Sequence, residues 1–308
     1  MNVLVTGGAG FIGSNLVRAL LERGDEVRVL DNFATGSRVN LDGLDVEIVE
    51  GELRSYERCH AAVRGVEVVF HLGALGSVPR SVQDPLTSNA VNVDGTLNIL
   101  LAARDEGIRR VVYSSSSSIY GSRTDLPLSE EMAADPISPY GVAKLAAERH
   151  CVSFSRVYHR FESVVLRYFN VFGPRQSPHS QYAAVVPLFI TAVAAGRSIT
   201  VFGDGEQSRD FTYVDNVVDA TMRAADAPDA NGRILNVAAG SPATVNDLAR
   251  SIGRILGKDP QIDYRPPRAG DIRDSWARID RAREVLGFEP SVHLDEGLAR
   301  TVRALVET

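Results

Sequence analysis

A regular alternation in the first 170 residues constrains the fold more than any other feature of the sequence. Short apolar runs rich in β-branched residues predict strands at 2–6, 26–30, 46–50, 66–70, 110–114 and 162–168. Longer amphipathic stretches between them predict helices near 11–23, 55–64, 88–107 and 139–159. Strands that alternate with helices in this way form βαβ units with parallel strands. The sequence therefore predicts an α/β fold built on a doubly wound parallel sheet.

The alternation weakens after about residue 170, where long loops rich in Gly, Pro and Arg appear at 172–180, 201–211 and 264–275. Helical patterns at 182–195, 214–225 and 245–256 lie between these loops, so the loops are not linkers. We expect residues 1–170 to form one domain. Residues 171–308 should form a smaller C-terminal α/β lobe that closes over the carboxyl ends of the strands, with part of the chain returning to the first domain.

Composition excludes several classes of function. A formal net charge of −6 gives no electrostatic reason to bind nucleic acid or an anionic membrane. The only cysteines, Cys59 and Cys151, are too few for a disulfide framework, and neither has metal-ligand spacing, so no metal site is expected. No basic leader or long apolar span is recognisable, which predicts a cytoplasmic protein.

A glycine-rich loop follows the first predicted strand directly. The stretch GGAGFIG, Gly7 to Gly13, ends that strand and opens the helix at 11–23. Glycines let the backbone approach a pyrophosphate closely, and the helix start supplies amide donors, as in Rossmann dinucleotide sites. A glycine-rich turn alone would be weak evidence, but Asp31 at the end of the second strand adds the carboxylate that holds an adenosine ribose and repels a 2′-phosphate. The pattern predicts NAD rather than NADP.

Five serines, Ser114 to Ser118, follow the apolar strand at 110–114. This is the edge where open α/β sheets bind ligands, so the run is not a flexible linker. About twenty residues later, Tyr140 and Lys144 stand four apart on one face of a predicted helix. A nearby ammonium lowers the pKa of a phenol and makes it a better base. The pair alone is common in helices, and gains weight only beside the glycine loop, Asp31 and the serines.

With these features together, the chain resembles the extended short-chain dehydrogenase/reductase superfamily, and within it the UDP-hexose 4-epimerases. The resemblance covers essentially the whole chain. The segments that carry it are TGGAGFIG (6–13), LDN (30–32), HLGAL (71–75), NVDGT (92–96), SSSSSIYG (114–121), YGVAK (140–144), LRYFNVFGPR (166–175), VFGDGEQSRDF (201–211) and RAGDIRDSWA (268–277).

The resemblance implies a catalytic set of Ser116, Tyr140 and Lys144. Tyr140 would remove the proton of the sugar 4-hydroxyl, Ser116 would bond the same oxygen, and Lys144 would bind the nicotinamide ribose and lower the pKa of Tyr140. Hydride would pass to NAD and return to the other face of a 4-keto sugar, so that NAD stays tightly bound. Positions that the resemblance assigns to NAD are Gly7, Gly10, Phe11, Ile12, Gly13, Asp31, Asn32, Glu52, Leu53, Leu72, Gly73, Ala74, Asn92, Ser114, Tyr140, Lys144 and Tyr168.

A UDP-sugar substrate is likewise implied by resemblance. Arg209 and Arg268 match diphosphate-binding arginines, and Asp271 matches a carboxylate on the uridine ribose. An arginine fork suits a diphosphate because it pairs two oxygens at once. The other substrate positions are Ser77, Ser116, Ser117, Asn170, Ala184, Val185, Phe202 and Ser275. Homodimerisation through the helices at 88–107 and 139–159 is also implied by the resemblance.

Two comparisons within the superfamily bear on the reaction, and two departures from its pattern concern only the cofactor. Nucleotide-sugar 4,6-dehydratases carry an Asp-Glu pair where this chain has Ser117 and Ser118, so elimination lacks its acid and base. The same absence counts against the uronate decarboxylases. Glu52 stands where an Asp is usual, and Gly76 where some members have a Lys.

The identity of the sugar depends on Ser275. Epimerases restricted to non-acetylated sugars have a bulky Tyr there, so a serine predicts room for UDP-N-acetylglucosamine and UDP-N-acetylgalactosamine beside UDP-glucose and UDP-galactose. Alternatives left open are UDP-glucuronate 4-epimerisation, a net dehydrogenase or reductase, and a non-catalytic NAD-binding regulator.

Overall fold

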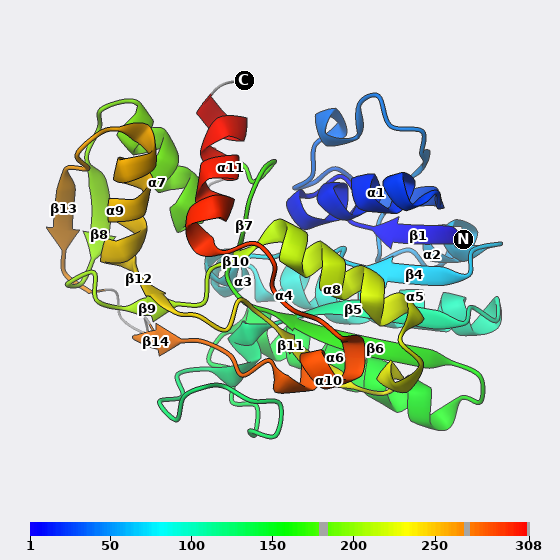
Figure 1. The fold of residues 1–308 in the computed structure, drawn as a ribbon. Coiled ribbons are helices and arrows are strands. Elements are labelled where there is room, and N and C mark those ends of the chain that lie inside the picture. Colours follow the sequence, from blue (N-terminus) through cyan, green and yellow to red (C-terminus); the bar gives the residue numbers. More distant parts are fainter. Residues whose placement is uncertain (179–183, 268–271, 307–308) are drawn as a thin grey trace.

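The computed structural model describes residues 1–178, 184–267 and 272–306. Its centre is a seven-stranded sheet in the order β11-β6-β5-β4-β1-β2-β3, in which every neighbouring pair is parallel (Figure 1). The strands are β1 (Asn2–Thr6), β2 (Glu26–Asp31), β3 (Glu47–Glu50), β4 (Val68–His71), β5 (Arg110–Ser116), β6 (Glu162–Tyr168) and β11 (Ile234–Val237). The predicted doubly wound parallel sheet is confirmed.

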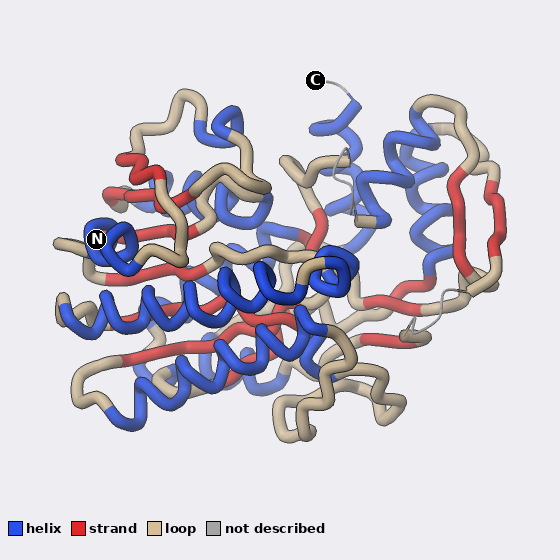
Figure 2. Tube along the Cα trace, turned by 180° about the vertical axis from the view of Figure 1, so that it is seen from behind, coloured by secondary structure: helices blue, strands red, loops and turns tan. Residues whose placement is uncertain are grey.

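Helices cover both faces of this sheet (Figures 1 and 2). On one face lie α1 (Phe11–Arg23), α8 (Val214–Asp226) and α10 (Asp280–Leu286), and on the other α2 (Tyr56–Val63), α5 (Gly95–Asp105) and α6 (Pro139–Val157). Alternate side chains of a strand point to opposite faces. In β1, Val3 and Val5 join the core that contains Leu16 of α1, whereas Leu4 joins the core that contains Ile99 of α5. Two apolar cores therefore hold the sheet rigid from either side.

The single helix predicted at 88–107 is interrupted in the structure. The chain forms α4 (Pro85–Asn89), a π-helical turn at Ala90–Asp94, and then α5. Within the π-turn, Asn92 is buried, its amide bonds the backbone of Leu75, and its carbonyl accepts a hydrogen bond from the Thr96 hydroxyl. These contacts hold the wider turn, which propensity patterns do not reveal.

A second group of elements lies beyond the carboxyl ends of the sheet strands (Figure 1). It is built from short pairings between distant segments: β13 (Ile262–Arg265) with β8 (Ile199–Phe202), β9 (Ser208–Arg209) with β12 (Ala243–Thr244) and β14 (Asp274–Ser275), and β7 (Val171–Phe172) with β10 (Thr212–Tyr213). Its helices are α7 (Val185–Ala194), α9 (Val245–Leu256) and α11 (Leu294–Val306).

The remaining elements are short. They are α3 (Val78–Gln83) and the 3₁₀ turns Arg38–Leu41, Ser117–Tyr120 and Pro228–Ala230. None of the helices in the described part of the chain combines the length and the apolar character that a membrane span requires.

Candidate active site

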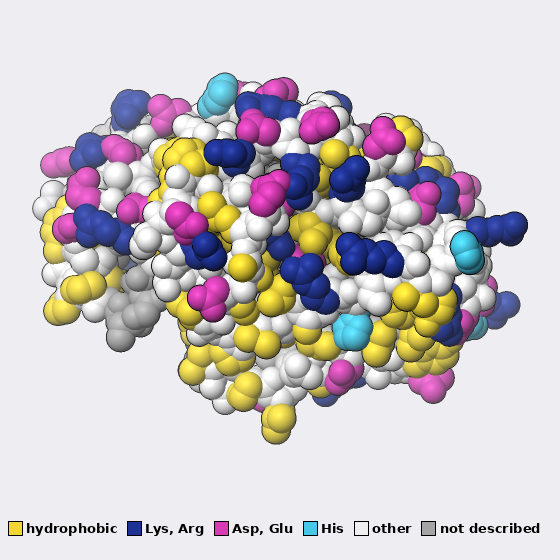
Figure 3. All heavy atoms as spheres, turned by 90° about the horizontal axis from the view of Figure 1, so that it is seen from below, with side chains coloured by type: hydrophobic (Ala, Val, Ile, Leu, Met, Phe, Trp, Pro, Cys, Tyr) yellow, Lys and Arg dark blue, Asp and Glu magenta, His cyan; other side chains and the backbone are white. Residues whose placement is uncertain are grey.

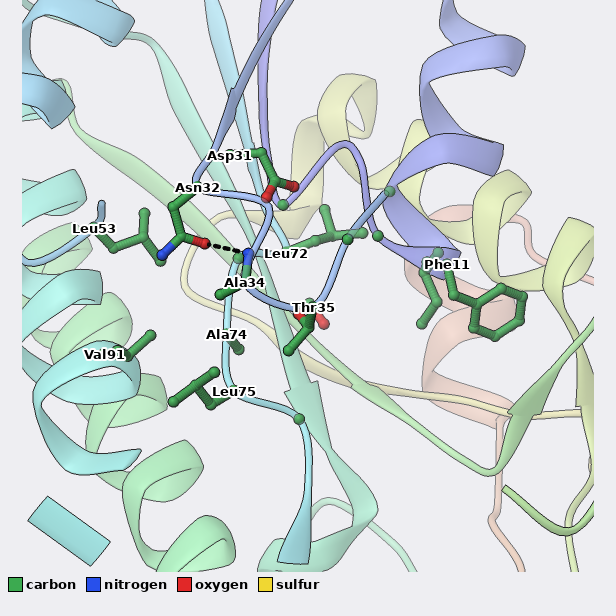
Figure 4. A pocket seen from close by; sticks show the side chains of 18 of the residues that line it. Phe11, Asp31, Asn32, Ala34, Thr35, Leu53, Leu72, Ala74, Leu75 and Val91 are labelled. Atoms are coloured by element: carbon green, nitrogen blue, oxygen red, sulfur yellow. Dashed lines mark hydrogen bonds between the residues drawn. The ribbon is translucent and has the colours of Figure 1, made fainter. Parts of the chain in front are cut away.

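A cavity of about 390 Å³ opens where β1, β2, β4 and β5 end (Figure 4). Side chains of the glycine loop and of the loops after β2 and β4 surround it, with Phe11, Asp31, Leu53 and Leu75 on different sides (Figure 4). Most positions expected to bind the cofactor line this one space: Gly7, Gly10, Phe11, Ile12, Gly13, Asp31, Asn32, Glu52, Leu53, Leu72, Gly73, Ala74 and Ser114.

The backbone around Gly7 and Gly13 leaves no room for side chains at these two positions. Gly7 has a φ of +70°, and a Cβ built on Gly13 would lie 2.1 Å from the carbonyl oxygen of Gly7. Gly10 is the N-cap of α1, and no side chain of the described residues caps that helix start. Backbone amides at the start of α1 thus face the cavity in the arrangement that binds a pyrophosphate. The loop fits a dinucleotide.

Asp31 is held rigidly at the end of β2. One carboxylate oxygen accepts a hydrogen bond of 2.9 Å from the amide of Ala9, and the other accepts one of 2.8 Å from the amide of Phe33. A carboxylate has about four acceptor positions, so both oxygens retain capacity for ribose hydroxyls. Next to it, the Asn32 side chain accepts from the amide of Ala34 and shapes the loop that covers the cavity (Figure 4).

A buried hydrogen-bonded chain supports the floor of the cavity. His71 lies between two threonine hydroxyls, 2.7 Å from Thr6 and 3.0 Å from Thr96, and the Thr6 hydroxyl also accepts from the amide of Gly73. Burial, with a smaller contribution from Lys144, lowers the pKa of His71 to about 3, so the ring is neutral. The sequence analysis quoted His71 only within a motif and assigned it no role.

Four expected cofactor residues do not line the cavity: Asn92, Tyr168 and the pair Tyr140 and Lys144, which is described below. Asn92 bonds the backbone of Leu75 with both ends of its amide and thereby supports the lining loop. Tyr168 is buried in the core, where its hydroxyl lies 2.7 Å from that of Thr221.

The three expected catalytic residues come together at the end of β5. The hydroxyl of Ser116 donates a hydrogen bond of 3.1 Å to the hydroxyl of Ser118, and the Ser116 side chain also acts to lower the pKa of Tyr140. Lys144, one turn further along α6, donates from Nζ to the carbonyl oxygen of Ser114 at 2.7 Å. Because Ser114 also lines the cavity, the Lys144 ammonium lies beside the space that the glycine loop encloses.

The pKa of Tyr140 does not shift in the direction expected from a nearby Lys144. Burial raises the pKa of Tyr140, and the group that lowers it is Ser116 through its hydrogen bond. Burial also lowers the pKa of Lys144 to about 8. Desolvation outweighs charge attraction among the protein groups, so a further positive charge beside Tyr140 is needed to make its phenol a base near neutral pH.

The expected substrate residues are spread over several elements. Ser77 and Ala184 line the same cavity, and Val185 begins α7 next to Ala184. Ser117 starts the 3₁₀ turn after β5, and Asn170 follows β6 with a φ of +30°, a left-handed conformation that asparagine tolerates. Phe202 ends β8.

Arg209 and Ser275 are paired neighbours in β9 and β14. The Arg209 guanidinium donates to the carbonyl oxygens of Ile272 and Arg273, and Ser275 is 8% exposed. Arg268 and Asp271 lie outside the described residues.

The cavity has further lining residues that were not named from the sequence: Ala34, Thr35, Gly36, Gly51, Arg54, Arg80, Val91, Gln176 and Ser177. The first three lie in the loop at 32–36, whose turn-forming composition was the available signal. Arg80 and Gln176 carried no local pattern that separates them from surface residues. Among the described residues, no cluster of three or more His, Cys, Asp or Glu side chains could hold a metal ion.

Comparison with known proteins agrees with this geometry. Residues 3–238 match the model of the NAD-dependent epimerase/dehydratase family. A UDP-glucose 4-epimerase from Mycolicibacterium smegmatis is 41% identical over 98% of this chain and 97% of its own length.

Two solved structures are similar throughout. A UDP-N-acetylglucosamine 4-epimerase from Methanobrevibacter ruminantium, in complex with UDP-N-acetylmuramic acid, superposes with a TM-score of 0.94 at 39% identity, over 99% of this chain and 98% of that one. A UDP-glucose 4-epimerase from Thermus thermophilus in complex with NAD superposes with a TM-score of 0.91 at 37% identity, over 99% of each chain. The glycine loop, the fixed carboxylate of Asp31 and these matches lead to one conclusion: the chain belongs to the NAD-dependent epimerase/dehydratase family, and its cofactor is NAD.

Proposed function

We propose that this protein inverts the 4-hydroxyl of UDP-hexoses, with Tyr140, Ser116 and Lys144 as its catalytic residues. The observation that carries the proposal is the contact between α6 and the serine-rich end of β5 beside the cavity of the glycine loop: Lys144 donates to the carbonyl oxygen of the cavity-lining Ser114, and Ser116 acts on the pKa of Tyr140. A binding protein without chemistry would have no use for this pair. Family membership and the UDP-sugar epimerases among similar proteins support the same reaction.

In this mechanism Tyr140 takes the proton of the 4-hydroxyl, and Ser116 donates a hydrogen bond to the same oxygen. NAD supplies an acceptor for the C4 hydride and, while oxidised, a positive charge. Lys144 binds a ribose hydroxyl of the cofactor. The proton held on the Tyr140 oxygen returns when the 4-keto sugar is reduced on its other face.

The carboxyl-terminal half would hold the nucleotide. We place the diphosphate near Arg209 and Arg268, the uridine ribose near Asp271, and the uracil near Ala184, Val185 and Phe202. Asn170, Ser77 and Ser117 would contact the sugar or diphosphate from the sheet side. This assignment gives residues 171–308 the nucleotide-sugar site and residues 1–170 the NAD site.

We further propose that the enzyme accepts N-acetylated sugars as well as UDP-glucose and UDP-galactose. Ser275 is small and buried, and it pairs with Arg209 in the sheet that would face the diphosphate. A Tyr at this position would fill space beside the 2-substituent of the sugar. UDP-glucuronate is the competing substrate.

A coupled assay of the wild type and the Ser275→Tyr variant on all five nucleotide sugars tests both levels of this proposal. We expect turnover of plain and N-acetylated UDP-hexoses by the wild type. In the variant the N-acetylated reaction should fall more than about a hundredfold, while the plain reaction stays within about threefold. Equal survival of both reactions would show that another residue selects the sugar. Absence of turnover with any of the sugars would contradict the proposed reaction.

We also propose a homodimer formed through the helices at 88–107 and 139–159. Large apolar side chains are exposed on and beside this pair, including Leu86 at 82% and Val142 at 53%. Hydrophobic side chains gather in patches along one edge of the face in Figure 3. Exposed apolar patches of this kind mark interaction surfaces, and sedimentation equilibrium would measure the association.

A further inference from the structure

Two residues of α6, spaced four apart, bond the serine-rich end of β5. Lys144 donates to the carbonyl oxygen of Ser114, and the carboxylate of Glu148 accepts a hydrogen bond of 3.1 Å from the hydroxyl of Ser115. Tyr140 stands one turn before Lys144, where the side chain of Ser116 acts on its pKa. Residues at this spacing lie on one helix face, so the helix is fastened to the strand at the two turns that follow Tyr140. The proposed mechanism uses Tyr140 and Lys144 but gives Ser115 and Glu148 no task.

Glu148 is the most firmly held of the three. Arg167 of β6 forms a two-pronged ion pair with it, from Nη2 at 2.7 Å and from Nε at 3.0 Å. Both side chains are completely shielded, with 0% exposure for Glu148 and 1% for Arg167. The guanidinium also donates to the hydroxyl of Tyr120, just beyond the serine run, at 2.7 Å. Glu148 therefore binds α6 to both β5 and β6.

A buried ion pair of this kind adds little to the stability of the fold, because both charges lose their hydration. Apolar side chains of the same volume would hold the helix against the sheet about as strongly. An arginine fork on a carboxylate does, however, fix direction as well as distance. The pair therefore restricts how far α6 can rotate about its own axis.

Rotation of α6 would act directly on the catalytic pair. A turn of about 10° moves an atom about 6 Å from the helix axis by about 1 Å. A misplacement of about 1 Å in a catalytic group can cost about a hundredfold in rate. The hydroxyl of Ser116 and the phenol of Tyr140 lie on different elements, so their relative position depends on this angle.

We propose that Glu148 is a positioning residue for the epimerase reaction: held by Arg167 and Ser115, it sets the rotation of α6 and so aligns Tyr140 with Ser116. The inference rests on the proposed function, since it assigns a task only if Tyr140 and Ser116 carry out the chemistry. It accounts for a second serine of the run, because Ser115 anchors the helix while Ser116 faces the reaction.

Ser115→Ala is the mildest test, because it removes one hydroxyl and no charge. Its matched control is Ser163→Ala: the buried Ser163 of β6 donates to the carbonyl oxygen of Cys151, also on α6, at 2.7 Å. Both variants lose one buried hydroxyl that joins a sheet strand to the same helix, so their melting temperatures should fall alike. We expect kcat to drop about tenfold in Ser115→Ala with KM within twofold, and to stay near wild type in Ser163→Ala.

The pH profile gives a readout that lost stability would not move. Since the Ser116 hydrogen bond opposes the effect of burial on the pKa of Tyr140, a weakened bond moves the acid limb of the kcat profile to higher pH. This shift should appear in Ser115→Ala and not in Ser163→Ala. The titratable neighbours, Lys144 on α6, Tyr113 on β5 and Arg80 beside Ser81 on α3, are the same in both variants.

A double variant, Glu148→Gln with Arg167→Met, removes both charges together and so avoids leaving one buried and unpaired. Circular dichroism and bound NAD would establish that it folds, and we expect kcat to fall about a hundredfold. Wild-type kcat in folded Ser115→Ala, or an equal loss in Ser163→Ala, would overturn the positioning role. Tyr140→Phe distinguishes failure of the proposed reaction from failure of the positioning role. If the wild type has no turnover, or if Tyr140→Phe keeps its turnover, the proposed reaction is wrong, and the positioning role of Glu148 is wrong with it.

Discussion

Two buried aspartates connect the chain in different ways in the two groups of elements of this molecule. Asp31, at the end of β2, accepts hydrogen bonds from the amides of Ala9 and Phe33, which lie 22 and 2 residues away in sequence. Asp210, which follows β9, accepts from the amides of Ala239, Gly240 and Ala277, which lie 29, 30 and 67 residues away. One carboxylate completes a local βαβ unit, whereas the other joins segments that meet only in the folded chain.

This difference shows which functional residues can be predicted from a sequence. A dinucleotide site is assembled from loops that directly follow neighbouring parallel strands, so local sequence motifs identify its residues. The second group of elements, where we propose the substrate site, contains two-residue strands and long loops, whose partners are set by tertiary packing. Substitutions in the loops after the parallel strands and substitutions at Asp210 should therefore have different effects.

The largest effect is expected in the glycine loop, from Gly13→Ala. Its Cβ would lie 2.1 Å from the carbonyl oxygen of Gly7, so the loop must shift away from the pyrophosphate position. We expect NAD affinity to fall more than about a hundredfold. The NAD content after gel filtration, read from absorbance and mass spectrometry of the denatured protein, measures the change.

Gly76→Ala provides the control for this prediction. Gly76 lines the same cavity, but a Cβ there would meet nothing within 4 Å. This variant should retain NAD like the wild type. Loss of NAD in both variants would mean that the cavity responds to any added bulk rather than to the close approach at Gly13.

A smaller effect is expected at the substrate end, from the pH dependence of Asp210. Burial raises the pKa of Asp210 from 3.8 to about 6, so the folded state favours its neutral form. Protonated Asp210 therefore contributes about 3 kcal/mol to the free energy of unfolding below pH 4. This contribution is lost as the pH rises through about 6. The neutral variant Asp210→Asn lacks this titration. The difference in unfolding free energy between wild type and variant, from urea titrations at pH 4 to 7, should shift in favour of the variant as the pH rises.

If the unfolding free energies of the wild type and of Asp210→Asn changed in parallel between pH 4 and 7, the effect of burial on the pKa of Asp210 would be contradicted.

The smallest effect is expected from Asp31→Ala, because the loop amides and not this carboxylate hold the pyrophosphate. The variant should lose about tenfold in its preference for NAD over NADP, since the charge that repels a 2′-phosphate is gone. Titration of the cofactor-depleted protein with each dinucleotide measures this ratio. An unchanged ratio would show that Asp31 only shapes the loop through Ala9 and Phe33.

Prediction from sequence succeeded where periodicity and local motifs decide the structure. The sheet followed from strands that alternate with helices, the glycine loop from a local motif, and most of the expected cofactor positions that line the cavity from the family resemblance; β6 and α1 have the predicted bounds. The π-turn that carries Asn92 was not predictable, because its cause is a contact with Leu75 across the fold. Burial was the second unpredictable factor: it raises the pKa of Tyr140, where a nearby Lys144 alone suggested the opposite direction.

The most direct test of the account follows the hydrogen at C4. UDP-glucose that carries deuterium at C4 is incubated with the holoenzyme in ordinary water, and the UDP-galactose formed is analysed by proton NMR and mass spectrometry. If one bound NAD takes up and returns the same hydride while Tyr140 handles only the hydroxyl proton, the product retains its deuterium at C4 almost completely. Loss of that deuterium to water, or its release as free reduced cofactor, would contradict an epimerisation carried out on a retained NAD.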